Sequence, residues 1–229
     1  MLVTLHVWRV PGRAVGAALL RMATEPRRIR ALPGVRFAKL LGTGAGRTFG
    51  PGDADVTRYA ALVVWDGTGR PDAVDRGWAG IAARSARVDL TPVASRGRWS
   101  GVAPFGTPEP HRITGPVLAL TRARLRPSRM LTFWRAVPPV ARELAAAPGL
   151  LARFGVGEAP IGWQGTVSVW RSAADLTAFA YRQPEHRAVV ARTPHARWYA
   201  EELFARFAVR DVSGDFDVLG WREGGLADP

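Results

Sequence analysis

One succession of secondary-structure elements is predicted twice along the chain, and this internal repeat restricts the fold more than any other feature. Each copy is expected to run strand, helix, strand, strand, helix, strand, because alternating apolar and polar stretches flank stretches with helical spacing. In the first copy these elements fall at 2–10, 14–24, 35–41, 58–65, 71–84 and 86–96. In the second copy they fall at 117–125, 128–146, 150–155 and 166–170, followed by a helix from 172 and a strand from 202.

Short motifs repeat in the same order. Leu32-Pro33-Gly34 and Ala147-Pro148-Gly149 form the same turn, and LVVWDG at 62–67 matches VSVWRS at 167–172. Each copy therefore predicts a βαββαβ, ferredoxin-like unit of the α+β class, whose helices cover one face of its sheet. Two such units can cover each other's bare face by packing sheet against sheet into a closed α/β barrel.

This repeat also predicts the domain organisation of the 229 residues. We expect an N-terminal ferredoxin-like repeat at 1–98, a linker rich in proline and glycine at 99–115, and a C-terminal ferredoxin-like repeat at 116–229. The reactive residues are expected in the second repeat.

The composition excludes several classes of site. Cysteine is absent, which excludes disulfides, thiolate metal ligands and a cysteine nucleophile, while 47% hydrophobic residues suffice for a packed core. No apolar run approaches the roughly 20 residues that span a bilayer. The N-terminus lacks the basic-then-apolar order of a secretion signal. These features predict a cytoplasmic protein.

The net charge of +13 comes almost entirely from arginine, because Lys39 is the only lysine. The arginines are scattered through every segment, whereas nucleic-acid binders concentrate positive charge in a stripe. We therefore expect a solvated basic surface and no nucleic-acid partner. Attraction to an anionic membrane surface or to an acidic protein partner is left open.

The stretch 163–209 holds two of the four histidines and is the expected centre of the chemistry. Ser172, with an aspartate three positions later, is typical of a capping box that begins a helix. Pro184 ends that helix and can open a short new one, in which the spacing places His186 on the same face as two valines. Its imidazole is thus predicted to point into a pocket. His195 follows a proline in a turn-like position and is the second choice.

The first copy has no counterpart to His186, because the matching part of its second helical region, 76–88, contains no histidine. This asymmetry favours a role for His186 in one pocket, although a lone histidine on an apolar face is more often a core residue. The remaining histidines are weaker candidates. His6 is expected in mid-strand, and His111 is expected in the linker.

Five segments carry a resemblance to a known family: FAKLLGTGAG at 37–46, SRGRWSGVAPF at 95–105, LTRARLRPSRMLTFWRAVP at 120–138, GVGEAP at 155–160 and WYAEELFARFAV at 198–209. In their order and spacing they resemble the spheroidene monooxygenase family, which oxidises carotenoids. The resemblance covers nearly the whole chain. It implies a haem oxygenase that uses dioxygen and reduced ferredoxin to hydroxylate a hydrophobic polyene, with a second hydroxylation giving a ketone. The implied fold is the dimeric α/β-barrel type.

Within that resemblance haem b is the implied cofactor. His186 is the predicted axial ligand, because a chain without cysteine must offer haem iron an imidazole. The haem carboxylates need cations, and Lys39, Arg96 and Arg98 lie in segments that match the family. Each of these three is otherwise an ordinary surface charge.

Aromatic residues in the same segments are further candidates. Trp99, predicted beside the cofactor, could wall a long apolar tunnel together with Phe133 and Trp134. The three could equally be core aromatics.

Two other functions stay open. A haem protein of the same fold could carry out a peroxidase-like or dehydratase-like reaction on a nitrogenous or aromatic metabolite, because one fold hosts many chemistries. A cofactor-free ferredoxin-like module, including an RNA-binding one, is opposed by the dispersed arginines and by the lack of an aromatic strand signature. Peripheral membrane contact and self-association are left open as well.

Overall fold

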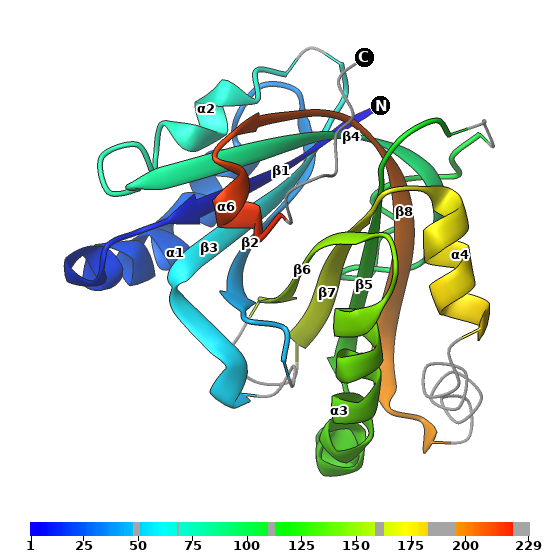
Figure 1. Ribbon diagram of the computed structural model, residues 1–229. Helices are drawn as coiled ribbons and strands as arrows, with labels where there is room; N and C mark the ends of the chain where they lie inside the picture. The colour runs from blue at the N-terminus through cyan, green and yellow to red at the C-terminus, as the bar shows by residue number, and fades with distance from the viewer. Residues whose placement is uncertain (48–50, 68, 110–112, 159–162, 183–195, 222–229) are drawn as a thin grey trace.

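The computed structural model of the chain describes residues 1–47, 51–67, 69–109, 113–158, 163–182 and 196–221 (Figure 1). Its first half contains β1 (Leu2–Arg9), α1 (Val15–Arg30), β2 (Val35–Gly44), β3 (Ala54–Trp65), α2 (Asp72–Asp75) and β4 (Arg84–Gly97). Its second half contains β5 (Val117–Leu125), α3 (Met130–Ala146), β6 (Leu150–Gly157), β7 (Trp163–Trp170), α4 (Ala173–Arg182), β8 (Tyr199–Gly214) and α6 (Phe216–Leu219).

The strands of the described chain close into one barrel in the order β1-β3-β2-β6-β7-β5-β8-β4, with antiparallel neighbours throughout. Within each half, the fourth strand lies beside the first, followed by the third and the second, which is a ferredoxin-like order. The halves meet along two unequal seams. β4 pairs with β8 from Ala86 to Gly97, whereas β2 pairs with β6 only over Gly42–Gly44.

The α+β class and the closed barrel are therefore confirmed. The duplication of the sequence and the division at 1–98, 99–115 and 116–229 stay predictions. The segment expected as a linker does more than connect the halves, because its Trp99 and Phe105 are buried in the barrel core.

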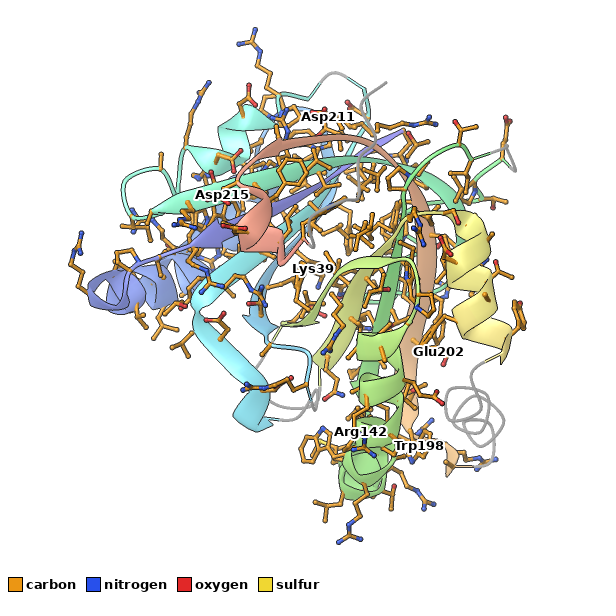
Figure 2. All side chains as sticks on the ribbon, viewed as in Figure 1. Lys39, Arg142, Trp198, Glu202, Asp211 and Asp215 are labelled. Carbon is orange, nitrogen blue, oxygen red and sulfur yellow. The ribbon has the colours of Figure 1, made fainter. Side chains whose placement is uncertain are left out.

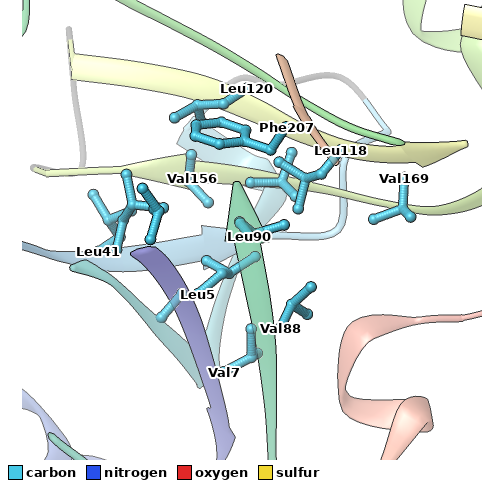
Figure 3. Close-up of a cluster of buried hydrophobic side chains, with 14 of the residues drawn as sticks. Leu5, Val7, Leu41, Val88, Leu90, Leu118, Leu120, Val156, Val169 and Phe207 are labelled. Carbon is cyan, nitrogen blue, oxygen red and sulfur yellow. The ribbon is translucent and has the colours of Figure 1, made fainter. Parts of the chain in front are cut away.

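Side-chain alternation along the strands fills the barrel interior. Val3, Leu5 and Val7 of β1 point inward, as do residues at alternate positions of the other strands. Figure 3 shows Leu5 and Val7 beside inward side chains of β4, with those of β5 and β8 above them. The remaining strand positions face outward, toward the helices.

α1 and α2 lie on the outer face of the first half's sheet, and α3 and α4 lie on that of the second half (Figure 1). α6 differs, because its Val218 and Leu219 are buried in the barrel core. Under α1 and α2 lies a cluster built on large aromatic side chains: Trp8, Tyr59, Trp65 and Trp78. The cluster under α3 and α4 is smaller, and its members are Val117, Leu144, Ala147, Leu150, Trp170, Leu176 and Phe179. Among the described residues, the outer layer of the second half thus buries fewer large aromatic side chains than that of the first.

The repeated turn before the second strand of each copy is confirmed. Gly34 has φ +79° and Gly149 has φ +76°, a backbone conformation that glycine adopts without strain. A Cβ at Gly34 would lie 2.8 Å from the backbone nitrogen of Gly69. Glycine is therefore required here both by conformation and by space.

Two helices of the first half differ in length from the prediction. α1 continues to Arg30 through Pro26, and Arg28 ties this last part to the α2 region by donating to two backbone carbonyls there. α2 forms only 72–75 of the expected 71–84. Beyond it the chain continues in turns that bury Trp78, and Gly77 lies against α1, where a Cβ would meet the side-chain ends of Glu25 and Arg28. Glycine also lowers helix propensity at this point.

The helix starts of the second half give one confirmation and one correction. The Asp175 N–H donates to the Ser172 hydroxyl at 3.1 Å, and that hydroxyl donates to the Asp175 carboxylate at 2.7 Å, so the capping box is confirmed. The helix expected over 128–146 begins two residues later, because 127–129 form a 3-10 turn and α3 begins at Met130 without a side-chain cap. In the described ranges, no helix is long and apolar enough to cross a membrane.

Candidate functional site

The two halves of the barrel can be compared position by position through their strand registers. Leu2 of β1 pairs with Trp65 of β3, and Val117 of β5 pairs with Trp170 of β7. Residues that lie the same number of positions along the strands from these pairs correspond to each other. On the outer faces, the corresponding residues include His6 and Thr121, Trp8 and Ala123, Tyr59 and Gln164, and Leu40 and Gly155. At each of these positions the first half carries the larger side chain.

The outer layer of the first half is filled by these large side chains. Trp8 stacks on Trp78 with ring centroids 4.6 Å apart, and Tyr59 lies 5.2 Å from the same indole. His6 is fully buried, with Nδ1 3.0 Å from Asp75 and Nε2 2.9 Å from the Thr4 hydroxyl. Both ring nitrogens are thus engaged, and His6 is a core histidine.

The second half presents a different surface, which we call the small-residue face: Thr121, Ala123, Gly155, Gln164 and Thr166. Thr121 is exposed, although its strand is flanked by β7 on one side and β8 on the other. A side chain at the centre of a sheet is normally covered when helices lie on that face. Thr121 therefore marks a part of this face that the described side chains leave uncovered. Four of the five residues are smaller than their counterparts in the first half, whereas Thr166 corresponds to the smaller Ala61.

The helices beside the small-residue face contact it incompletely. α4 contacts β5 and β7, and α3 contacts β6. No residue of α3 before Ala141 is buried, although this part includes Phe133, Val137 and Val140. Trp134 reaches the face, since its indole N–H donates to Gln164 at 3.1 Å. Apolar side chains of α3 thus remain available to a ligand.

Of the three predicted carboxylate-binding cations, only Arg96 lies at the small-residue face. Arg96 pairs with Phe204 of β8, and Phe204 pairs with Thr121, so the three side chains share the outer surface. The guanidinium of Arg96 stacks on the Phe204 ring at 4.3 Å and is exposed. Among the described residues, no carboxylate pairs with it.

Lys39 and Trp99 lie elsewhere, in a group that we call the Glu158 cluster: Lys39, Trp99, Arg122, Glu158 and Glu201. The Lys39 ammonium lies 2.5 Å from the Glu158 carboxylate, and the Trp99 indole N–H donates to the same carboxylate at 2.7 Å. Figure 2 shows Lys39 among the side chains of the barrel and not beneath α3 or α4. Arg98, the third cation, donates to the carbonyl of Gly101 at 2.8 Å.

Arg122 joins the cluster from inside the barrel. It occupies the inward position that Val7 holds in the first half, its side chain is 4% exposed, and it donates to Glu158 at 2.9 Å and also to Glu201. Glu201 further accepts the backbone N–H groups of Ser100 and Gly101. The cluster thus joins both halves and the segment between them through opposite charges.

Both carboxylates of the cluster are held ionised. Burial raises the pKa of Glu158, but hydrogen bonds from Lys39 and Trp99 and the charges of Lys39 and Arg122 outweigh it, so the pKa falls below its usual value. Burial also raises the pKa of Glu201, and the N–H groups of Gly101 and Ser100 together with Arg122 lower it further than burial raises it. The cluster is therefore a balanced set of charges and not an acid or base poised near neutral pH.

Glu158, Arg122 and Glu201 were not among the residues predicted from the sequence. One signal was present, because Arg122 stands at an inward position of an alternating strand, between Leu120 and Arg124. An arginine inside a barrel needs carboxylate partners. Which carboxylates those are depends on how the barrel closes.

The predicted axial ligand His186, the second choice His195, and His111 all lie outside the described residues. Their roles stay predictions. In the part of the chain that the structure describes, no group of three or more histidine, aspartate or glutamate residues is arranged to hold a metal ion.

Two proteins named spheroidene monooxygenase are similar to this chain over most of its length. The one from Rhodobacter capsulatus is 32% identical over 197 residues, covering 80% of this chain and 79% of that protein. The one from Rubrivivax gelatinosus is 37% identical over 189 residues, covering 80% and 72%. The chain belongs to the spheroidene monooxygenase family. No general family model matches this spheroidene monooxygenase homologue.

Solved structures show the fold of this spheroidene monooxygenase homologue in other proteins. An aldoxime dehydratase gives a TM-score of 0.57 at 15% identity, covering 92% of this chain and 81% of that one. An aldoxime dehydratase in complex with butyraldoxime gives 0.54 at 11% identity, covering 92% and 79%. At these identities the likeness concerns the fold alone, and it supports the barrel with outer helices.

Proposed function

We propose that this chain is a haem-dependent monooxygenase that hydroxylates a hydrophobic polyene such as a carotenoid, with a second hydroxylation at the same carbon giving a ketone. In each cycle one oxygen atom of dioxygen enters a C–H bond of the substrate. The other leaves as water with two electrons, supplied by a ferredoxin, and two protons. Membership of the spheroidene monooxygenase family carries this proposal.

The small-residue face fits a large flat cofactor beside an extended apolar substrate. It replaces an imidazole, an indole, a phenol and an isobutyl group of the first half with a threonine, an alanine, a glutamine and a glycine. These side chains are smaller than their counterparts, and Thr121 among them is exposed. Haem supplies, when bound, the activation of dioxygen that no side chain can provide.

The residues around this face have distinct parts in the proposal. Arg96 is exposed beside it and would hold a carboxylate of the cofactor. Thr121 and Thr166 place hydroxyls on this face beside the Gln164 amide, and these hydroxyls would donate hydrogen bonds to a ligand or water held there. The apolar side of α3, including Phe133 and Val137, would exclude water and align the polyene.

His186 is proposed as the axial ligand. The chain contains no cysteine, so an imidazole is the fitting donor for a haem of this chemistry. The stretch with His186 joins α4 to β8, and these two elements border the small-residue face through their contacts with β5. His195 lies in the same stretch and is the alternative.

A visible spectrum of the purified chain, reconstituted with haemin, tests the cofactor. We expect a Soret band that is lost in His186→Ala and retained in His195→Ala. Arg96→Gln should weaken haem binding, whereas Arg98→Gln, a matched change at an arginine that donates to the Gly101 carbonyl, should leave it unchanged. A colourless protein that takes up no haemin would overturn the proposal.

Turnover tests the reaction. With reduced ferredoxin and dioxygen, the haem-loaded chain should convert an acyclic carotenoid to hydroxylated and ketone products that are resolved by mass. An aldoxime should not be dehydrated. Dehydration of the aldoxime without oxidation of the carotenoid would replace the monooxygenase with the dehydratase-like alternative.

A further inference from the structure

The start of α3 bears an open depression of about 500 Å³. It is lined by three arginines, a serine and a tyrosine: Arg126, Ser128, Arg129, Arg197 and Tyr199. β5 leads to this depression, because Thr121 and Ala123 of the small-residue face lie on the strand that ends at Leu125, one residue before Arg126. The depression and the small-residue face therefore belong to the same end of the second half.

The charge at this depression is positive and uncompensated. From 126 to 142 the sequence contains four arginines and no acidic residue. Within the described ranges, no carboxylate forms an ion pair with Arg126, Arg129 or Arg197. α3 has neither a side-chain cap nor an acidic residue in its first turn, so the partial positive charge of its N-terminus adds to that of the arginines.

An apolar side chain stands out from the same surface. Leu131 is 66% exposed in the first turn of α3, two residues after Arg129 and four before the exposed Arg135. Two residues further along α3, Phe133 packs edge-on against Trp198 and Tyr199, with ring centroids 5.7 and 5.8 Å apart. An exposed leucine surrounded by arginines, with aromatic rings beside them, is the pattern of a segment that lies in a membrane interface.

We propose that the start of α3 docks on an anionic lipid surface, with Arg126, Arg129 and Arg197 on lipid phosphates and Leu131 inserted among the acyl chains. The purpose of this docking rests on the proposed function. A polyene dissolved in the bilayer could pass to the small-residue face without crossing water. The docking itself depends only on the charge and exposure described above.

Sedimentation of the full-length protein with lipid vesicles tests this docking. The protein should bind vesicles of phosphatidylcholine mixed with phosphatidylglycerol and should not bind phosphatidylcholine alone. Each arginine near an anionic surface contributes about fivefold to binding, so Arg126→Gln/Arg129→Gln/Arg197→Gln should weaken it roughly a hundredfold. Leu131→Ser should weaken binding without changing its dependence on salt.

Matched variants on α1 and just before it distinguish a specific docking surface from the general attraction of a basic protein to anionic lipid. Arg13, Arg27 and Arg30 are exposed on the other half, and their triple change to glutamine removes the same charge. Leu20→Ser matches Leu131→Ser, because Leu20 is 64% exposed. Both control variants should bind vesicles as the unaltered chain does. Unchanged thermal melting of each variant shows that the fold is retained.

Three results would overturn the docking proposal: no binding to the anionic vesicles, full binding by the α3 triple variant, or equal loss in the α1 triple variant. Absence of vesicle binding together with saturable binding of a plant-type ferredoxin at the same arginines would assign the surface to an acidic protein instead. The vesicle assay contains neither haem nor substrate. Docking without carotenoid oxidation would therefore contradict the proposed function and leave the docking intact.

Discussion

The indole N–H of Trp99 donates a hydrogen bond of 2.7 Å to the Glu158 carboxylate, so the segment between the two halves is fixed to the loop that follows β6. The Trp99 ring is fully buried in the barrel core, with the Arg122 guanidinium 5.5 Å from its centroid. This one side chain thus joins the apolar interior to the Glu158 cluster.

Trp99→Ala should lower the free energy of unfolding by about 3–5 kcal/mol, because a fully buried indole leaves a cavity when it is removed. Trp99→Phe keeps most of the volume and removes the hydrogen bond to Glu158, which should cost about 1–2 kcal/mol. Urea denaturation of the two variants measures both values. Equal losses would show that the hydrogen bond and not the packing dominates.

Glu158→Gln should destabilise the protein by about 2–3 kcal/mol, because Lys39 and Arg122 would lose their shared carboxylate while remaining largely buried. Glu202→Gln is the matched control. Because Glu202 forms no ion pair with another described residue, this change should alter stability by less than about 0.5 kcal/mol. Denaturant unfolding compares the pair. A loss in Glu202→Gln as large as that in Glu158→Gln would contradict the importance of the cluster.

The pH dependence of stability follows from the lowered pKa values of Glu158 and Glu201. In the unfolded chain these groups protonate near the usual value of 4.5, and in the folded protein they protonate below it. Their stabilisation is therefore fully present above pH 4.5 and is lost as the pH falls through the folded values. Urea unfolding between about pH 6 and pH 3 should show a flatter acid limb in Glu158→Gln/Glu201→Gln.

Thr121→Trp should fill the small-residue face while the barrel stays folded. Because Thr121 is exposed, the change should alter stability by less than about 0.5 kcal/mol. The affinity for haemin should nevertheless fall about tenfold or more, since the indole occupies the space proposed for the ligand. Val56→Trp, at a 56% exposed position of the first half, is the control for haemin titration. Undiminished haemin uptake by Thr121→Trp would place the ligand elsewhere.

The strands could be predicted from the sequence because their alternation is local. The expected strand at 117–125 coincides with β5, and Ser172 caps α4 as its spacing indicated. The length of α2 could not be predicted, since Gly77 and the burial of Trp78 matter only once α1 packs beside them.

The site was less accessible to sequence reasoning. Thr121 and Ala123 are unremarkable residues of an alternating strand until the registers set them against His6 and Trp8. Glu158 and Lys39 are 119 positions apart, and they meet only because β2 and β6 close the barrel. Arg96 was predicted as a carboxylate-binding cation because it lies in a segment that resembles the family. Its position beside Phe204 follows from the pairing of β4 with β8.

The two seams of the barrel differ in more than length. Where β2 meets β6, the paired residues include Gly42, Gly44, Gly155 and Gly157, which offer no side chains to brace one strand against the other. Local opening of the barrel should therefore begin where β2 pairs with β6, at this glycine border. The longer β4–β8 ladder should stay paired and act as the hinge. Lys39 and Glu158 form an ion pair across that border, and the pair therefore opposes such separation.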